Sequence, residues 1–150
     1  MILALDISTS CTGYCLFDEN GLVDIGSINL SKHKGLYEKA SYVKEGILNL
    51  SKKHTIKEVV VEENLQAFRP GLSSAKTLMT LAQFNGVVRW ICHENLKVSV
   101  EAINVNTARK SVGLKIDKKD KSKTTKEKVL DWVSIDDPSI AWPTKILKSG

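Results

Sequence analysis

The sequence ILALDISTSCTGYCLFDENG, residues 2–21, decides how the chain is expected to fold. Residues 2–7 form an apolar run broken only by Asp6, which is typical of a buried strand. Residues 12–17 favour a second strand, and the Asn20-Gly21 pair that follows is a strong signal for a hairpin turn. Residues 22–30 favour a third strand. The segment therefore predicts an antiparallel meander of three strands.

Beyond the meander, helical and strand patterns alternate. A helix is predicted over residues 35–54 because apolar residues recur at three- and four-residue steps, at Leu36, Ala40, Val43, Ile47 and Leu50. The apolar run 59–61 predicts an interior strand that ends in two acids. Pro70 and Gly71 interrupt any helix, so the next helix should begin after Ser73 or Ser74 and run to about residue 95. A strand over 98–103 and a short helix over 124–133 follow.

This order of elements predicts an α/β domain with a mixed five-stranded sheet flanked by helices, in which three antiparallel strands are followed by parallel ones. We expect one domain over residues 1–150, with residues 134–150 as an irregular tail because no helical period is visible there. No run of the sequence approaches the roughly 18 apolar residues of a membrane helix. Three cysteines without a matching pattern of ligands favour reduced thiols over a disulfide framework or a zinc site.

Positive charge is concentrated in one segment. The chain carries a net charge of +5, and residues 106–128 contain nine basic and three acidic residues, so this window alone carries +6 and the rest of the chain −1. A local cationic segment on an otherwise balanced protein indicates a polyanionic partner. A lysine-rich solvated loop is the alternative explanation.

Two acidic positions are candidates for chemistry. Asp6 lies near the end of a central apolar strand, where a carboxylate is costly unless a partner such as a cation compensates. Glu62 and Glu63 end another interior strand, and strand alternation lets only one of them face a given site. Carboxylates that meet at one sheet edge repel each other unless a cation lies between them, and their hard oxygens favour Mg²⁺ or Mn²⁺. Alternatively, Asp6 caps a turn through Ser8 or Thr9, and the two glutamates begin a solvated loop.

Several motifs, in order, carry a resemblance to a known family. The opening up to Asp6, with Thr12-Gly13-Tyr14 after it, resembles the start of RuvC-type Holliday-junction resolvases. The strand ending at Glu62 resembles their second acidic strand, and the helix with residues 81–86, LAQFNG, is similar to their long helix. Residues 105–114, VNTARKSVGL, and the lysine-rich stretch after them resemble the phage-like branch of the family. The match covers about residues 1–133.

The resemblance implies an RNase H-like fold, a homodimer, two divalent metal ions (Mg²⁺ or Mn²⁺) and endonucleolytic cleavage of branched DNA, in the cytoplasm of a bacterium or a phage-infected cell. Asp6 and Glu62 take the places of the family's first two catalytic, metal-binding acids, and Glu63 ranks below Glu62. The residues expected to meet DNA phosphates are Arg109, Lys110, Lys115, Lys118, Lys119, Lys121 and Lys123. Phe68 and Arg69 lie on the loop where family members place an aromatic that opens the junction, although an ordinary packed loop aromatic is the alternative.

The C-terminal part departs from the family pattern. Family members end in a helix that returns further aspartates to the site, whereas here Asp136-Asp137-Pro138 is followed by Pro143, which prevents a regular helix. Either one of these aspartates, with Asp137 as the candidate ligand, substitutes for the family's third acid, or the family's last helix is missing.

Three other functions remain open. Residues 5–10, LDISTS, also resemble the phosphate loop of actin-like ATPases and tRNA-threonylcarbamoylation proteins, but a second phosphate loop is not visible. A catalytically impaired junction-binding module is a second alternative, and a general Mg²⁺-dependent nuclease or RNase H without junction preference is a third.

Overall fold

The chain is described by a computed structural model that covers residues 1–63, 74–117, 120 and 122–142. It divides into two compact units, Met1–Val105 and Asn106–Gly150. In the described ranges, no helix is long and apolar enough to cross a membrane.

The first unit is built on one five-stranded sheet with the order β3-β2-β1-β4-β5. β1 pairs antiparallel with β2, and β2 with β3, whereas β1 pairs parallel with β4, and β4 with β5. This confirms the predicted mixed sheet and its N-terminal meander. The strands are β1 (Ile2–Asp6), β2 (Cys11–Asp18), β3 (Gly21–Asn29), β4 (Glu58–Glu62) and β5 (Ser99–Ile103).

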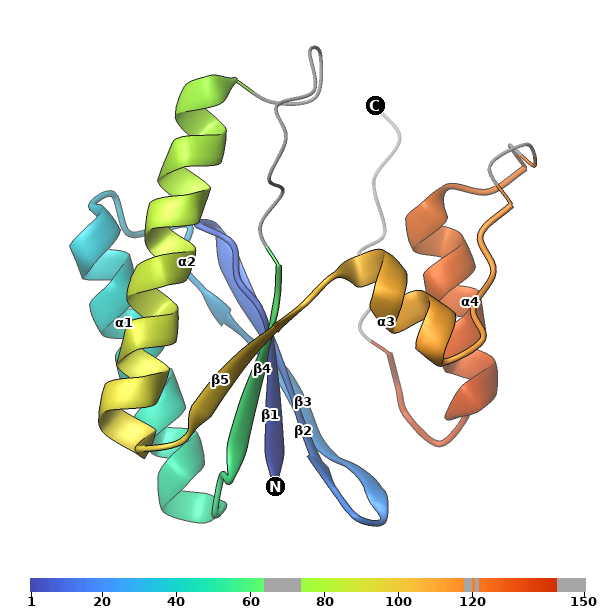
Figure 1. Ribbon diagram of the computed structural model, residues 1–150, viewed down its shortest axis with the longest axis horizontal. Helices are drawn as coiled ribbons and strands as arrows, with labels where there is room; N and C mark the ends of the chain where they lie inside the picture. Colours follow the sequence, from blue (N-terminus) through green and yellow to red (C-terminus); the bar gives the residue numbers. More distant parts are fainter. Residues whose placement is uncertain (64–73, 118–119, 121, 143–150) are drawn as a thin grey trace. The chain divides into compact units, whose positions relative to one another are not determined.

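Two helices, α1 (Leu36–Lys53) and α2 (Ala75–Leu96), pack on one face of this sheet (Figure 1). Ser74 caps α2, because its Oγ accepts the Thr77 N–H at 3.1 Å, as one of the two predicted serines should. The core lies between the helices and the sheet. Its fully buried members include Leu3, Leu16, Val43, Ile47, Val59, Phe84 and Val88.

The second unit contains α4 (Thr125–Asp136) and most of α3 (Val105–Ser111). A capping box starts α4: the Glu127 N–H donates to Thr124 Oγ1 at 3.3 Å, and the Thr124 N–H donates to Glu127 Oε2 at 2.6 Å. This helix ends three residues after its predicted end, so the prediction of an irregular tail is wrong for residues 134–136. The expectation that the family's last helix is missing stays a prediction, and residues 143–150 lie outside the described part of the chain.

Candidate metal centre

The register between β1 and β4 brings Asp6 and Glu62 side by side. Leu5 lies opposite Val61 in the last pair between these strands, and Asp6 and Glu62 are the next residues of the two strands. Neighbouring strands are about 4.8 Å apart, so two side chains at paired positions start from adjacent points of the sheet. The two acids, 56 positions apart in the sequence, therefore lie at the same end of two neighbouring strands.

Both acids also lie on the same face. Alternate residues along a strand point to opposite faces. The odd-numbered positions of β1 and β4 are buried beneath the helices: Leu3, Leu5, Val59 and Val61. Asp6 and Glu62 occupy even positions and are exposed, so both belong to the face opposite α1 and α2.

The surroundings of Asp6 are open on the β2 side. Asp6 lies opposite Gly13, where an added Cβ would be in ordinary van der Waals contact with the Asp6 Cβ, at 3.8 Å. Glycine therefore adds no side chain next to Asp6 on this strand.

Asp6 does not cap the turn that follows it. Ser8 Oγ instead pairs with Ser10 Oγ at 3.1 Å, and Thr12 Oγ1 donates to the Ser8 carbonyl at 3.4 Å. Across the described residues, no hydrogen bond or ion pair involves the Asp6 carboxylate. The alternative of a turn cap is therefore wrong, and the carboxylate is available to a cation.

A lysine of α1 holds the loop after Asp6. Lys39 Nζ donates to the Thr9 carbonyl at 2.6 Å, and both residues are partly buried. A hydrogen bond from a charged donor is stronger than a neutral one. The sequence did not single out Lys39, because a helical pattern does not show which lysine contacts a loop 30 residues away.

Glu63 is held away from the pair. Its Oε2 accepts the Asn104 Nδ2–H at 3.1 Å, and its N–H donates to the Ile103 carbonyl at 2.9 Å. Strand alternation sends its side chain away from the face of Glu62. These contacts support the lower rank of Glu63, whose role as a ligand stays a prediction.

The predicted phosphate-binding cations differ in their surroundings. Lys123 Nζ pairs with Asp131 Oδ2 at 2.7 Å, and this hydrogen bond raises the pKa of Lys123. In contrast, Arg109, Lys110 and Lys115 have no carboxylate partner among the described residues. The remaining predicted contacts, Phe68, Arg69, Lys118, Lys119 and Lys121, lie outside the described residues.

Sequence comparison relates the chain to a known nuclease. No family model matches the chain. A curated protein, the crossover junction endodeoxyribonuclease RuvC of Aliarcobacter butzleri, is 36% identical over 91 residues. The match takes in 58% of this chain and 55% of that protein, so the chain spans about half the length of this curated relative.

Solved structures decide the fold. RuvC of T. thermophilus in complex with a Holliday junction substrate matches with a TM-score of 0.60 at 15% identity, over 73% of this chain and 68% of that one. The chain has the fold of RuvC-type resolvases. A second Thermus thermophilus RuvC structure matches with a TM-score of 0.59 at 17% identity, over 89% of this chain and 77% of that one. The yeast mitochondrial Holliday junction resolvase matches with a TM-score of 0.54 at 13% identity, over 89% and 60% of the two chains.

The predicted resemblance to RuvC-type resolvases and the predicted fold class are therefore confirmed. Within this RuvC-like fold, the described residues contain no cluster of three or more His, Cys, Asp or Glu side chains that could hold a metal ion. Asp137, in the second unit, accepts the Ser139 Oγ–H at 2.6 Å. Its role as a further ligand stays a prediction.

The chain also contains a helix that the sequence did not predict. Residues Val105–Ser111 form α3, which carries Arg109 and Lys110 in its last turn. With only 7 residues, α3 is too short to show a helical period. The one available signal was Gly113, which has the positive φ of 74° that ends many helices.

Proposed function

We propose that this chain is a metal-dependent, structure-specific endonuclease that cleaves branched DNA, such as Holliday junctions, in the cytoplasm. The observation that carries the proposal is that Asp6 and Glu62 lie at the same end of two neighbouring strands and on the same face of the sheet. The likeness to RuvC in sequence and fold supports the same activity. A further support is the group of cations without carboxylate partners among the described residues of the second unit.

The donor set fits a hard divalent cation. Two carboxylates on adjacent strands supply oxygen ligands of the kind that Mg²⁺ and Mn²⁺ prefer. Asp6 and Glu62 would hold the metal ions, with Glu63 or Asp137 as candidates for further ligands. When bound, two such ions supply a water of lowered pKa and stabilise the oxygen that leaves the phosphorus.

The protein residues then have separate roles. Asp6 and Glu62 hold negative charge at the place where a cation is needed, and Lys39 fixes the loop next to Asp6. Arg109, Lys110 and Lys115 bind phosphates and so orient the DNA strand. No side chain needs to act as a nucleophile, because the attacking group is water. A homodimer would present two such sites to a two-fold symmetric junction.

Substitution of Asp6 by Asn tests the proposal. Asp6→Asn keeps the size of the side chain but removes its charge, so we expect it to abolish cleavage of a four-way junction in Mg²⁺ or Mn²⁺. Binding of the junction should stay the same or become tighter, since a negative charge is removed near the phosphates. Full cleavage by Asp6→Asn would exclude the proposal.

The substrate range is tested in the same assay. Cleavage of a four-way junction, a flap, a duplex and an RNA–DNA hybrid should differ, with the junction cut fastest. Equal cleavage of all four would favour a general nuclease.

A junction-binding module without catalysis is the second candidate. It is favoured by one observation: the described residues hold two carboxylates at the site but no cluster of three possible ligands. The unsubstituted chain would then bind the junction but form no cleavage product in the presence of Mg²⁺ or of Mn²⁺. Product formation that depends on Asp6 excludes this second candidate.

A further inference from the structure

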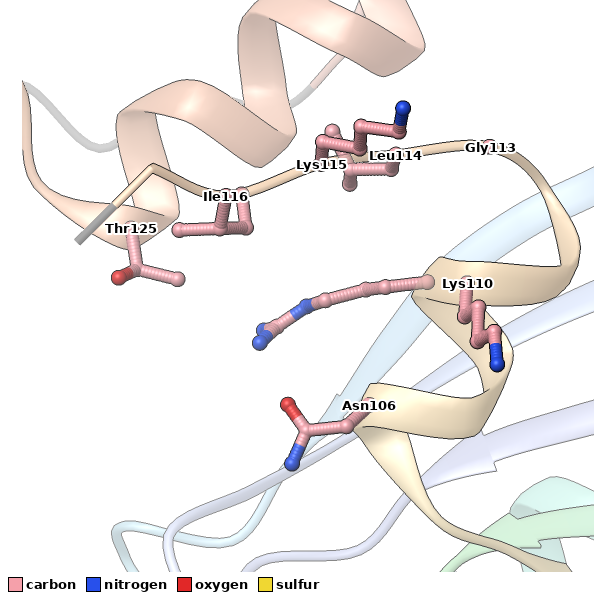
Figure 2. A pocket seen from close by; sticks show the side chains of 8 residues that line it. Asn106, Lys110, Gly113, Leu114, Lys115, Ile116 and Thr125 are labelled. Carbon is pink, nitrogen blue, oxygen red and sulfur yellow. The ribbon is translucent and has the colours of Figure 1, made fainter.

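A cavity of about 420 Å³ lies in the second unit, beside α3 (Figure 2). Its walls come from α3, from the segment that follows α3, and from the start of α4. The residues that line it are Asn106, Arg109, Lys110, Gly113, Leu114, Lys115, Ile116 and Thr125. The sequence predicted cations here but no hollow between them.

The end of α3 explains why the cavity forms. The Leu114 N–H donates to the Arg109 carbonyl at 2.9 Å, and the Gly113 N–H donates to the Lys110 carbonyl at 3.1 Å. This pair of bonds is a Schellman motif, and Gly113 supplies the left-handed conformation that the motif requires. The turn reverses the chain, so that Ile116 faces Asn106 across the cavity (Figure 2).

The lining combines three kinds of chemistry. Arg109 is partly buried and has no carboxylate partner among the described residues, so its charge is available to an anion. Leu114 and Ile116 are partly buried apolar side chains, and the Asn106 amide faces the cavity (Figure 2). No acidic residue is among the described residues that line the cavity.

We propose that this cavity receives one unstacked deoxynucleotide of the DNA, with its phosphate against Arg109 and its base against Leu114 and Ile116. The proposal rests on the proposed function, because it assumes that branched DNA is the substrate. A cavity of about 420 Å³ is of the size that holds small molecules, and a phosphate alone would leave its apolar wall uncovered.

Branched DNA is a suitable source of such a nucleotide. Extruding a base costs least where the base is already unpaired or lacks a stacked neighbour. The nucleotides at a branch point meet this condition. Arg109 can bind the phosphate through two N–H groups, and apolar side chains contact any base without selecting its sequence.

Photocrosslinking locates the nucleotide directly. A four-way junction carries one 4-thiothymidine at a time at each position near the branch point, and binding is followed by anisotropy in EDTA, so that no cleavage occurs. After irradiation and digestion, we expect one branch-point position to crosslink to Leu114 or Ile116. Crosslinks that map only to other segments, while the junction is fully bound, would overturn the inference and leave the proposed function intact.

A matched pair of substitutions tests the role of Arg109. Arg109→Gln should weaken junction binding about tenfold and reduce the crosslink to Leu114 or Ile116. The control Lys126→Gln removes the same charge from α4 outside the cavity and should weaken binding less, with the crosslink unchanged at saturation. Equal effects of the two substitutions would mean that Arg109 contributes only non-specific electrostatic attraction to DNA, and would overturn the inference. A chain that binds neither the junction nor single-stranded DNA would contradict both proposals.

Discussion

Glu62 and Glu58 lie on the same face of β4, at opposite ends of the strand. Glu62 directly follows Val61, the partner of Leu5, and so lies at the same end of the strands as Asp6, whereas Glu58 lies opposite Ile2. We expect Glu62→Gln to reduce the cleavage rate by a factor on the order of 100 or more, because loss of a metal ligand costs several kcal/mol of transition-state stabilisation. Glu58→Gln, the matched control, should leave the rate within about twofold of the unsubstituted chain. Single-turnover cleavage of a junction measures both, and equal losses would contradict the site.

The acids themselves could be predicted from the sequence, but their pairing could not. Asp6 stands out because a carboxylate interrupts an apolar strand, and Glu62 because it ends one. Their juxtaposition depends on a register that is set by packing of the buried positions against α1 and α2, beginning with Leu3 opposite Val59. A shift of one residue would send one acid to the other face.

The three thiols should differ in reactivity. Burial raises the pKa of Cys92 to about 12, and burial, with a smaller effect of Asp24, also raises the pKa of Cys15. Cys11 is exposed. Since the thiolate is the reactive form, Cys92 should stay unlabelled by a thiol reagent at about pH 8 until the protein unfolds, while Cys11 reacts first. Peptide mapping after timed labelling checks the order, and labelling of Cys92 as fast as Cys11 would contradict the buried core.

Two helical glycines differ in what lies next to them. A Cβ at Gly46 of α1 would overlap Cδ1 of Ile28 and lie 3.0 Å from its Cγ1, whereas a Cβ at Gly86 of α2 would meet nothing within 4 Å. Gly86→Ala should therefore raise the free energy of unfolding by about 0.5–1 kcal/mol. Gly46→Ala should lower it by about 1 kcal/mol, because the cost of overpacking exceeds the gain in helix propensity. Urea unfolding of both variants measures these changes. If the free energy of unfolding changed in the same direction in both variants, the close packing of α1 on β3 would be contradicted.

The long elements were predictable and the shortest one was not. The sequences of α1 and α2 show several turns of apolar periodicity, which predicts helices. The sequence of β4 is an apolar run that ends in acids, which predicts an interior strand. α3 fixes the positions of Arg109 and Lys110, yet its 7 residues left only Gly113 as a signal. The cavity beside it arises from a chain reversal, which a pattern of cations does not predict.

Charge is divided unequally over the whole molecule, since residues 106–128 carry +6 and the remainder −1. Each phosphate contact releases counterions, so the logarithm of the association constant should fall linearly with the logarithm of salt concentration. Lys115→Gln should reduce this slope by about 0.9, as one lost phosphate contact does. Lys123→Gln should reduce it less, because Lys123 is already paired with Asp131. Anisotropy titrations at several salt concentrations measure the slopes, and a larger change for Lys123→Gln would contradict the assignment.

For the whole molecule, the order of the motifs along the chain predicted the fold better than any single motif did. The acidic strands, the long helix and the basic segment follow one another as in RuvC-type resolvases, and the fold agrees. The predicted homodimer and the phage-like branch stay predictions, because they depend on surfaces and residues beyond this shared core.

The most direct test of the account is the position of a bound metal ion. Crystals of the full chain soaked in Mn²⁺ should show an anomalous peak in contact with carboxylate oxygens of both Asp6 and Glu62, and the peak should be lost in Asp6→Asn. A peak bound elsewhere with both acids unoccupied, or no peak at saturating Mn²⁺, would contradict the claim that these two strands together hold a cation.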